Sequence, residues 1–224
     1  MTFPRRVAVL IVVPLLALLA ACGSSSSSDS SPKPSGSAEC TYTKAGQAAR
    51  KVDLPPGTPV TTQPTTVNIS TNRGDIKADL NGDTAPCTVN SFLSLAKQGY
   101  FENTKCHRLH TQDYYVLQCG DPTGTGAGGP GYRFDDELSG SETYTAGTLA
   151  MANGGPNTNG SQFFIVYRNS GFPPAYTVFG HVNAAGLQLV QGIAKEGIGT
   201  PSDNPQLGPG DGTPKNPVVI QSVK

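Results

Sequence analysis

The sequence is poor in charged side chains, and those it has are balanced: 16 basic residues stand against 16 acidic ones in a chain of 224. Nucleic-acid binding needs a basic surface, so that class of function is not expected. The chain also lacks tryptophan and internal repeats. It has no Gly-x-Ser-x-Gly elbow, and His107 and Arg108 fall on opposite strand faces, which argues against a hydrolase that uses Ser161.

The longest apolar run, Val7 to Ala20, is too short to predict a membrane span. It follows Arg5 and Arg6 and leads into small residues, so we interpret residues 1–21 as a secretory signal peptide. Leu19-Ala20-Ala21-Cys22 resembles a bacterial lipobox. We therefore expect cleavage before Cys22, a lipid on its sulfur, and an outward-facing protein anchored to the cell membrane. An ordinary signal peptide or an uncleaved anchor is the alternative.

The next stretch, Gly23 to Ala38, is mostly serine with proline and glycine. Such a composition cannot bury apolar surface, so residues 22–65 are interpreted as a lipid-anchored flexible tether followed by a Pro/Thr-rich arm. Loss of Arg5 and Arg6 with the signal leaves 14 basic against 16 acidic residues, a net charge of −2. The remaining residues, 66–224, are enough for one domain with its own core.

Hydrophobic periodicity predicts many short strands and two helices. Residues 67–71 and 76–80 alternate apolar with polar side chains on either side of an Asn-Arg-Gly-Asp turn, which predicts a hairpin. Helical spacing follows Pro86 and stops at Gly99. Such a pattern fits a closed β-barrel with helical caps. A second helix is expected over 184–195, and further strands over 105–110, 115–119, 148–152, 163–167, 177–182 and 217–223.

A loop rich in glycine and asparagine, Met151 to Gly160, leads into a short apolar strand. Glycine allows a partner to approach the backbone closely. Because side chains alternate along a strand, Gln162 and Phe164 face one way, and Phe163 and Ile165 the other. One face can therefore present an amide beside an aromatic ring, while the other fills a core.

Two further blocks accompany this loop. One is His107-Arg108-Leu109, followed by Tyr115-Val-Leu-Gln118 and Cys-Gly-Asp121, and the other is Phe172-Pro-Pro-Ala-Tyr-Thr-Val-Phe-Gly180. Together, and in this order, they closely resemble the cyclophilins, a family of peptidyl-prolyl cis-trans isomerases. The resemblance implies a closed eight-stranded antiparallel β-barrel with a helix over each end, an activity on X–Pro bonds, and no metal or other cofactor.

The resemblance also implies the catalytic residues. Rotation about an X–Pro bond is slow because the amide C–N bond has partial double-bond character. A cation aimed at the prolyl nitrogen stabilises the twisted amide more than the planar one. Arg108 stands at the family's catalytic arginine, and Gln118 and Gln162 match two family glutamines that bind substrate carbonyl and amide groups.

Substrate contacts are expected from the same blocks. Each aromatic residue taken singly could equally belong to a core, and the glycine loop could be a plain turn. The positions that the resemblance assigns to substrate binding are Tyr115, Val116, Phe164 and Phe172 around the proline ring, the backbone of Ala152, Asn153 and Gly154, Gly124 in a glycine loop, and Tyr176.

The chain departs from the family pattern in several places. Gly171 falls where many members carry a tryptophan that binds cyclosporin, and Tyr176 stands at a common histidine position. Val116 replaces a common methionine and Gly154 a common alanine, while two extra residues lie within 110–114. We therefore predict isomerase activity with weak sensitivity to cyclosporin.

Four cysteines remain once Cys22 is set aside: Cys40, Cys87, Cys106 and Cys119. An even number in an exported protein favours two disulfides, for which three pairings exist. If positions 108 and 118 point into one pocket, Cys106 and Cys119 lie on different faces, which favours Cys87–Cys106 with Cys40–Cys119. A zinc site from Cys106, His107, His110 and Cys119 is the alternative, but structural zinc sites use tighter paired spacings.

The leading hypothesis is thus an exported monomeric prolyl isomerase that acts on proline-containing unfolded or loop segments and assists folding at the cell envelope. A second hypothesis is a scaffold that binds such segments in the same pocket with little turnover. The arginine at position 108 favours the enzyme.

Overall fold

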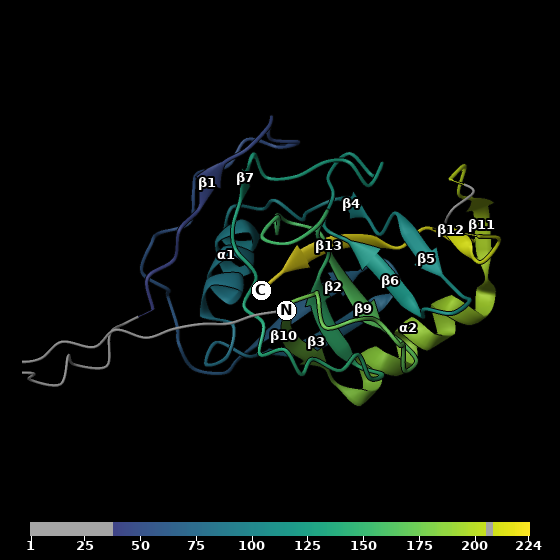
Figure 1. Cartoon of the computed structure of the whole chain (residues 1–224). Coiled ribbons are helices and arrows are strands. Elements are labelled where there is room, and N and C mark those ends of the chain that lie inside the picture. The colour runs from purple at the N-terminus through teal and green to yellow at the C-terminus, as the bar shows by residue number, and fades with distance from the viewer. Residues whose placement is uncertain (1–37, 205–207) are drawn as a thin grey trace, which may run out of the picture. The chain divides into compact units, whose positions relative to one another are not determined.

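One curled antiparallel sheet of eleven strands forms the body of the protein in the computed structural model, which describes residues 38–204 and 208–224. The predicted signal peptide and Cys22 lie outside these residues. The strands run in the order β11-β12-β5-β6-β9-β8-β10-β3-β2-β13-β4, and every pair is antiparallel (Figure 1). Their bounds are β2 Thr65–Thr71, β3 Gly74–Leu80, β4 Thr104–Lys105, β5 Arg108–His110, β6 Val116–Cys119, β8 Thr148–Met151, β9 Phe163–Val166, β10 Val178–Val182, β11 Ile198–Pro201, β12 Asp211–Pro214 and β13 Val219–Val223.

The closed eight-stranded barrel expected from the sequence is wrong in detail. Among the described residues no pairing joins the two edge strands, β11 and β4, so the sheet is a half-barrel. Two physical causes account for the difference. The strand predicted over 105–110 is divided into β4 and β5, which pair with different neighbours, β13 and β6. Residues 198–214, which show no alternation, add the β11–β12 hairpin at one edge.

The predicted hairpin over 67–80 is confirmed as β2 and β3. Its alternating side chains bury Val67, Ile69, Ile76, Ala78 and Leu80 on one face, while the other face is polar and half-buried to exposed. This alternation fixes the register, because a shift by one residue would expose the whole apolar set.

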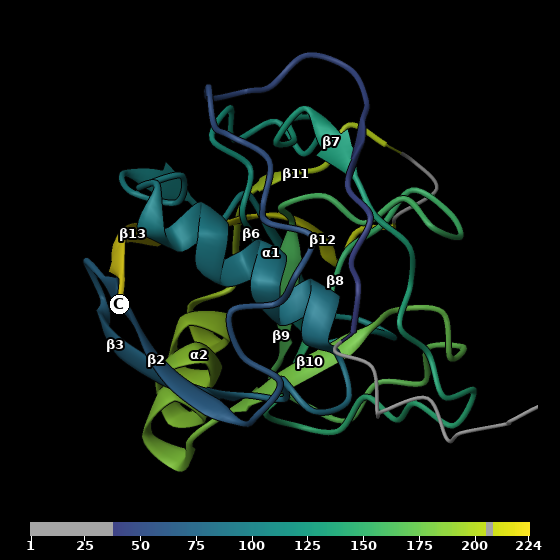
Figure 2. The same ribbon diagram turned by 90° about the vertical axis from the view of Figure 1, so that its left-hand side faces the viewer.

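Both predicted helices are present, as α1 (Pro86–Lys97) and α2 (Ala184–Glu196). Pro86 occupies the first turn of α1, where no backbone donor is needed. The Asn183 side chain caps α2 by accepting a hydrogen bond from the Gly186 amide at 2.8 Å. Figures 1 and 2 show α1 beside the N-terminal arm and α2 away from it. Neither helix of the described part is long and apolar enough to cross a bilayer.

The N-terminus of α1 is capped from a distant loop. Its capping position, Ala85, has no side chain that can accept a hydrogen bond. Instead the Glu137 carboxylate accepts from the backbone amides of Cys87 and Thr88 at 2.9 and 2.8 Å. A negative charge at this end of a helix also interacts favourably with the helix dipole.

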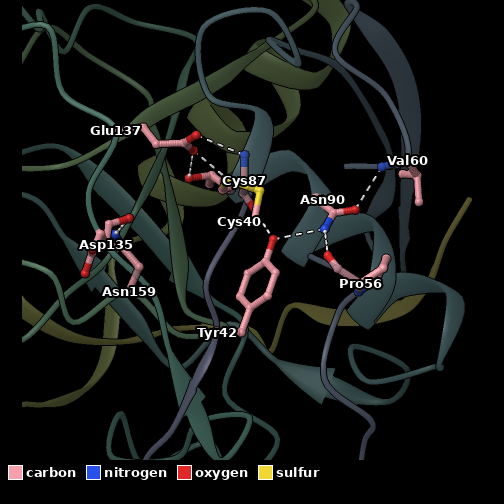
Figure 3. Close-up of a disulfide and its surroundings, with 10 residues drawn as sticks. Cys40, Tyr42, Pro56, Val60, Cys87, Asn90, Asp135, Glu137 and Asn159 are labelled. Carbon is pink, nitrogen blue, oxygen red and sulfur yellow. Dashed lines mark hydrogen bonds between the residues drawn. A yellow bond between two sulfur atoms is a disulfide. The ribbon is translucent and has the colours of Figure 1, made fainter. Parts of the chain in front are cut away.

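The arm before the sheet packs against α1 rather than hanging free. A disulfide joins Cys40 to Cys87, and the Tyr42 hydroxyl donates to the Cys87 carbonyl at 2.7 Å (Figure 3). Asn90 bridges back to the arm by donating to the Pro56 carbonyl at 2.8 Å. Within residues 40–50 the chain forms one two-residue strand, β1 (Thr43–Lys44), which pairs with β7 (Tyr132–Arg133).

The disulfide pairing expected from the sequence is wrong: Cys40 bonds to Cys87 and Cys106 to Cys119. The strand-parity argument failed because Cys106 does not lie in a continuous strand with Arg108. It sits between β4 and β5, where the chain leaves β13, and its amide still bonds to Val218. This change of partner turns the Cys106 side chain into the main core, where Cys119 also lies.

Two separate apolar clusters lie on the two faces of β6, β8 and β9. The larger one, under α1, contains Leu117, Leu149, Phe163 and Ile165. The smaller one consists of Val116, Tyr144, Ala150, Phe164 and Val166. All residues of β8 and β9 are consequently buried. No helix of the described residues contributes to the smaller cluster, and it contains predicted site residues.

Candidate active site

Three neighbouring strands, β5, β6 and β9, bring together the side chains that the sequence singles out. Arg108 lies directly opposite Gln118, and Gln118 lies opposite Phe164. Residues that face each other across antiparallel strands point to the same side of the sheet and are close enough to interact. Gln162 immediately precedes β9 and joins them. A cation, two carboxamides and an aromatic ring thus share one face.

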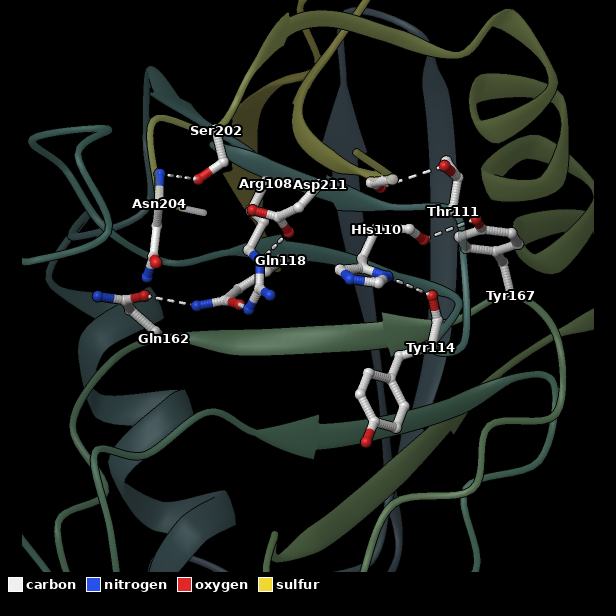
Figure 4. Close-up of polar contacts among 11 residues, drawn as sticks. Arg108, His110, Thr111, Tyr114, Gln118, Gln162, Tyr167, Ser202, Asn204 and Asp211 are labelled. Atoms are coloured by element: carbon white, nitrogen blue, oxygen red, sulfur yellow. Dashed lines mark hydrogen bonds and ion pairs between the residues drawn. The ribbon is translucent and has the colours of Figure 1, made fainter. Parts of the chain in front are cut away.

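Hydrogen bonds connect the polar members in one direction (Figure 4). Arg108 Nη1 donates to Gln118 Oε1 at 3.3 Å, and Gln118 Nε2 donates to Gln162 Oε1 at 2.8 Å. Gln162 Nε2 in turn donates to the carbonyls of Gly126 and Gly128 at 2.8 and 2.9 Å. Each carboxamide oxygen accepts a hydrogen bond and each carboxamide nitrogen donates one. This row of hydrogen bonds therefore fixes the orientation of the Gln118 and Gln162 side chains.

The guanidinium of Arg108 is held on two sides and open on the third. Its Nε donates to Asp211 Oδ1, and its Nη1 to Gln118. Its Nη2 has no hydrogen-bond partner among the described residues. The side chain is 29% exposed, so a donor remains available to a bound molecule.

A cluster of aromatic side chains lies beside this polar row. Phe164 is 4% exposed, and its ring centroid lies 5.6 Å from that of Phe172 and 5.5 Å from that of Tyr176. Val116 belongs to the same cluster, and Ala152 packs against it. The structure therefore brings five of the sequence-predicted substrate residues together.

Sequence reasoning missed Tyr144, which holds this aromatic cluster in place. The ring of Tyr144 lies 5.4 Å from that of Phe172, nearly perpendicular to it. Its hydroxyl donates to the Tyr176 carbonyl and accepts from the Tyr176 amide, both at 2.9 Å. Burial raises the pKa of this hydroxyl, so it remains a donor. Tyr144 lies in no motif, and its role becomes visible only from the contacts.

Tyr115 does not join the aromatic cluster, although the sequence placed it there. It precedes Val116 and so faces the opposite side, where it packs against the main core and lies under the Arg168 guanidinium at 4.5 Å. Its neighbour Tyr114 takes the place next to the cluster. The ring of Tyr114 stacks on Phe172 with centroids 4.3 Å apart. The two extra residues within 110–114 account for the presence of Tyr114, rather than Tyr115, beside Phe172.

A buried carboxylate organises the glycine loop that follows β6. Asp121 is fully buried and accepts hydrogen bonds from the amides of Thr123, Gly126 and Gly128. Burial raises its pKa, but the hydrogen bonds from Thr123, Gly128 and Gly126 outweigh burial and hold the pKa below its ordinary value. Gly124 lies in this loop and lines a groove with Arg108 and Gln118. Gly128 needs to be glycine because a Cβ there would come within 2.0 Å of the carboxylate.

The backbone of residues 152–154 is only partly available. The amide of Ala152 is bonded to the Gln162 carbonyl and that of Gly154 to Thr158 Oγ1, both at 2.9 Å. These two amide donors are thus occupied, and the expectation that other backbone groups of residues 152–154 bind substrate stays a prediction. Asn153 and Gly154 nevertheless line a hollow of about 500 Å³ together with Gln118 and Gln162. Arm residues 45–47 form part of its wall.

The zinc alternative loses two of its four ligands, because Cys106 and Cys119 are bonded to each other. In the described ranges no group of three or more His, Cys, Asp or Glu side chains could hold a metal ion. Asp211 is a further residue that the sequence did not reveal. It contacts Arg108 from a hairpin about a hundred residues away in the chain.

The half-barrel with two helices, and an arginine–glutamine row beside an aromatic cluster, define a prolyl isomerase architecture. The family described as cyclophilin type peptidyl-prolyl cis-trans isomerase matches residues 66–224, and the chain belongs to it.

Named relatives agree with this class. The chain is 49% identical over 201 residues to the probable peptidyl-prolyl cis-trans isomerase B of Mycobacterium leprae, covering 83% of this chain and 66%, just under two thirds, of the relative. It is 40% identical to peptidyl-prolyl cis-trans isomerase A of Mycobacterium tuberculosis, covering 70% and 90%. A crystal structure of a Cryptosporidium parvum cyclophilin-type isomerase superposes with a TM-score of 0.60 at 33% identity, covering 72% and 96%. A second structure of that protein, in the presence of the dipeptide Ala-Pro, gives 0.57 at 32%, covering 71% and 97%.

Proposed function

We propose that this protein catalyses cis-trans isomerisation of X–Pro bonds in exported proteins and so assists their folding at the cell envelope. The observation that carries the proposal is the Arg108 Nη2 group. It is a donor without a partner in the described structure, held next to a cluster of aromatic side chains whose apolar surface suits a proline ring.

The reaction needs little more than this geometry. The barrier to rotation is about 18–20 kcal/mol because the prolyl nitrogen shares its lone pair with the carbonyl. As the amide twists, the lone pair localises on nitrogen and becomes a better hydrogen-bond acceptor. A donor from Arg108 Nη2 then binds the twisted form more strongly than either planar form, which lowers the barrier.

The remaining residues hold the substrate while it rotates. The rings of Phe164, Phe172 and Tyr176 would grip the apolar face of the proline ring. Gln118 Nε2 has a second hydrogen that the bond to Gln162 does not use, and this hydrogen can bind a substrate carbonyl. No proton is transferred, so the reaction needs no general acid or base.

A protease-coupled assay on an X–Pro peptide tests the proposal. Arg108→Ala should lower kcat/KM by about 10²- to 10³-fold, the usual cost of removing one transition-state donor. Because this change leaves Asp211 buried without its partner, Arg108→Lys serves as a second variant that keeps a cation there. Both variants need to remain folded by thermal unfolding. Wild-type protein that binds the peptide without accelerating its isomerisation would favour the scaffold hypothesis instead.

The location at the envelope is part of the same proposal and is supported by the sequence alone. The apolar run that ends at Cys22 favours export, cleavage and lipid attachment. The mass of the mature protein purified from membranes tests this, with Cys22→Ser as the control. We expect a diacylglyceryl-modified N-terminus in the wild type and loss of membrane association in the variant. An intact, unmodified N-terminus would contradict it.

A further inference from the structure

The β11–β12 hairpin places one carboxylate against the arginine of the site. Asp211 begins β12, which pairs with β5 so that Asp211 lies opposite His110 and Gly212 opposite Leu109. Figure 4 shows the Asp211 side chain reaching Arg108 from this strand. The hairpin thus lies at the edge of the active site, although its residues belong to none of the three sequence blocks that resemble the cyclophilins.

The backbone at this position is fixed from both sides. On one side, the amide of Ser202 donates to the Asp211 carbonyl at 2.9 Å; on the other, the amide of Thr111 donates to the Gly210 carbonyl at 2.8 Å. Gly212 has β11 packed directly on it: a Cβ there would lie 2.3 Å from the Thr200 carbonyl oxygen. Asp211 therefore cannot move away from β5 without breaking the hairpin.

The ion pair is asymmetric in its exposure. The Asp211 side chain is 2% exposed and that of Arg108 is 29% exposed. A buried carboxylate without a cation is strongly unfavourable, so Asp211 needs the guanidinium close by. The more exposed arginine is the member that can still meet another molecule.

Two fixed nitrogens determine the plane of a guanidinium, because its donors form a rigid planar fork. Asp211 binds Nε and Gln118 binds Nη1, which leaves Nη2 as the nitrogen without a hydrogen-bond partner among the described residues. Gln118 alone would hold a single nitrogen, at 3.3 Å, and the side chain could rotate about that contact.

We propose that Asp211 is a positioning residue for Arg108: through Nε it sets the plane of the guanidinium so that Nη2 faces the prolyl nitrogen. This inference rests on the proposed isomerase function. It gives the β11–β12 hairpin a role in catalysis without contact to the substrate.

Asp211→Asn is the first test, because it keeps the shape and removes the charge. We expect kcat/KM on an X–Pro peptide to fall about tenfold, through kcat rather than KM. Asp53→Asn is the matched control: Asp53 is an exposed aspartate of the arm that makes no ion pair in the described part of the chain. It should leave the rate within about twofold of the wild type.

A residue that acts only through Arg108 should have no effect once Arg108 is absent. In the Arg108→Ala background, Asp211→Asn should change kcat/KM less than twofold, since such effects are not additive within one unit. Independent, multiplying losses, or full activity of Asp211→Asn, would overturn the inference and leave the isomerase function standing.

A separate readout does not depend on turnover. In a ¹H–¹⁵N spectrum of the full chain, the Nε–H of Arg108 should exchange slowly with solvent in the wild type and rapidly in Asp211→Asn. Equal exchange in the two would refute the positioning role even if the protein were no isomerase. If the exchange rates differ but the wild type shows no isomerase activity, the proposed function fails instead.

Discussion

Removal of the Cys40–Cys87 disulfide tests how tightly the N-terminal arm belongs to the folded unit. The bond closes a segment of 47 residues, and the loss of loop-closure entropy in the unfolded chain gives a stabilisation of about 4 kcal/mol for a loop of that length. The same relation gives about 3 kcal/mol for Cys106–Cys119, which closes 13 residues.

The native contacts of the arm would survive this change. Tyr42 still reaches the Cys87 carbonyl, and Arg50 Nη1 still donates to the carbonyls of Gly99, Tyr100 and Glu102 at 2.7 to 2.9 Å. The destabilisation should therefore arise in the unfolded chain, with the folded structure nearly unchanged.

Urea unfolding of Cys40→Ala/Cys87→Ala measures the effect. We expect a single transition with a somewhat steeper slope, because the unfolded chain exposes more surface without the bond, and a free energy of unfolding about 4 kcal/mol below that of the wild type. A loss below about 1 kcal/mol would refute the reasoning, because it would mean that the arm detaches before the domain unfolds. Isomerase activity of the folded variant serves as the control for intact structure.

Three further predictions follow from the site and its surroundings. Gly128→Ala should displace the glycine loop from Asp121 and lower isomerase kcat/KM at least tenfold in the peptide assay, and unchanged kinetics would contradict the clash. The wild type should bind cyclosporin weakly. Gly171→Trp adds a side chain where a Cβ meets no atom within 4 Å, so it should tighten binding, as measured by calorimetry. A nanomolar dissociation constant for the wild type would be inconsistent with this prediction. The hydrogen bond from Arg73 lowers the pKa of Glu196 to about 2. The contribution of Glu196 to stability is therefore complete above pH 4.5 and disappears as the pH falls towards 2. The acid-induced fall in Tm should be smaller in Glu196→Gln, and the same dependence of Tm on pH in both proteins would argue against this.

The local pattern of apolar residues was sufficient to predict the elements whose side chains follow a regular period. The alternation of β2 and β3 and the helical spacing of α1 are properties of a few neighbouring residues, so their positions could be predicted within a few residues. The grouping of Arg108, Gln118 and Phe164 could also be anticipated, since each follows from strand parity and from the family motif.

What failed depends on contacts between distant segments. The disulfide pairing required knowing that the chain turns between β4 and β5 at Cys106, which no periodicity indicates. The partner of Arg108 lies in a glycine- and proline-rich stretch that resembles a loop in sequence and forms a strand only because β5 accepts it. Tyr115 and Tyr114 exchange sides because of a two-residue insertion whose conformation the sequence does not specify.

The Cys40–Cys87 bond also determines where a mechanical pull on the chain would act. Tension applied to the residues before Cys40 would pass through the sulfur atoms directly into α1, whose buried side chains lie in the main core. The force would bypass the two-residue pairing of β1 with β7. It would also bypass residues 45–47, which line the hollow beside Gln118 and Gln162. Force applied to the residues before Cys40 would therefore leave the sheet face that carries Arg108, Gln118 and Phe164 undistorted.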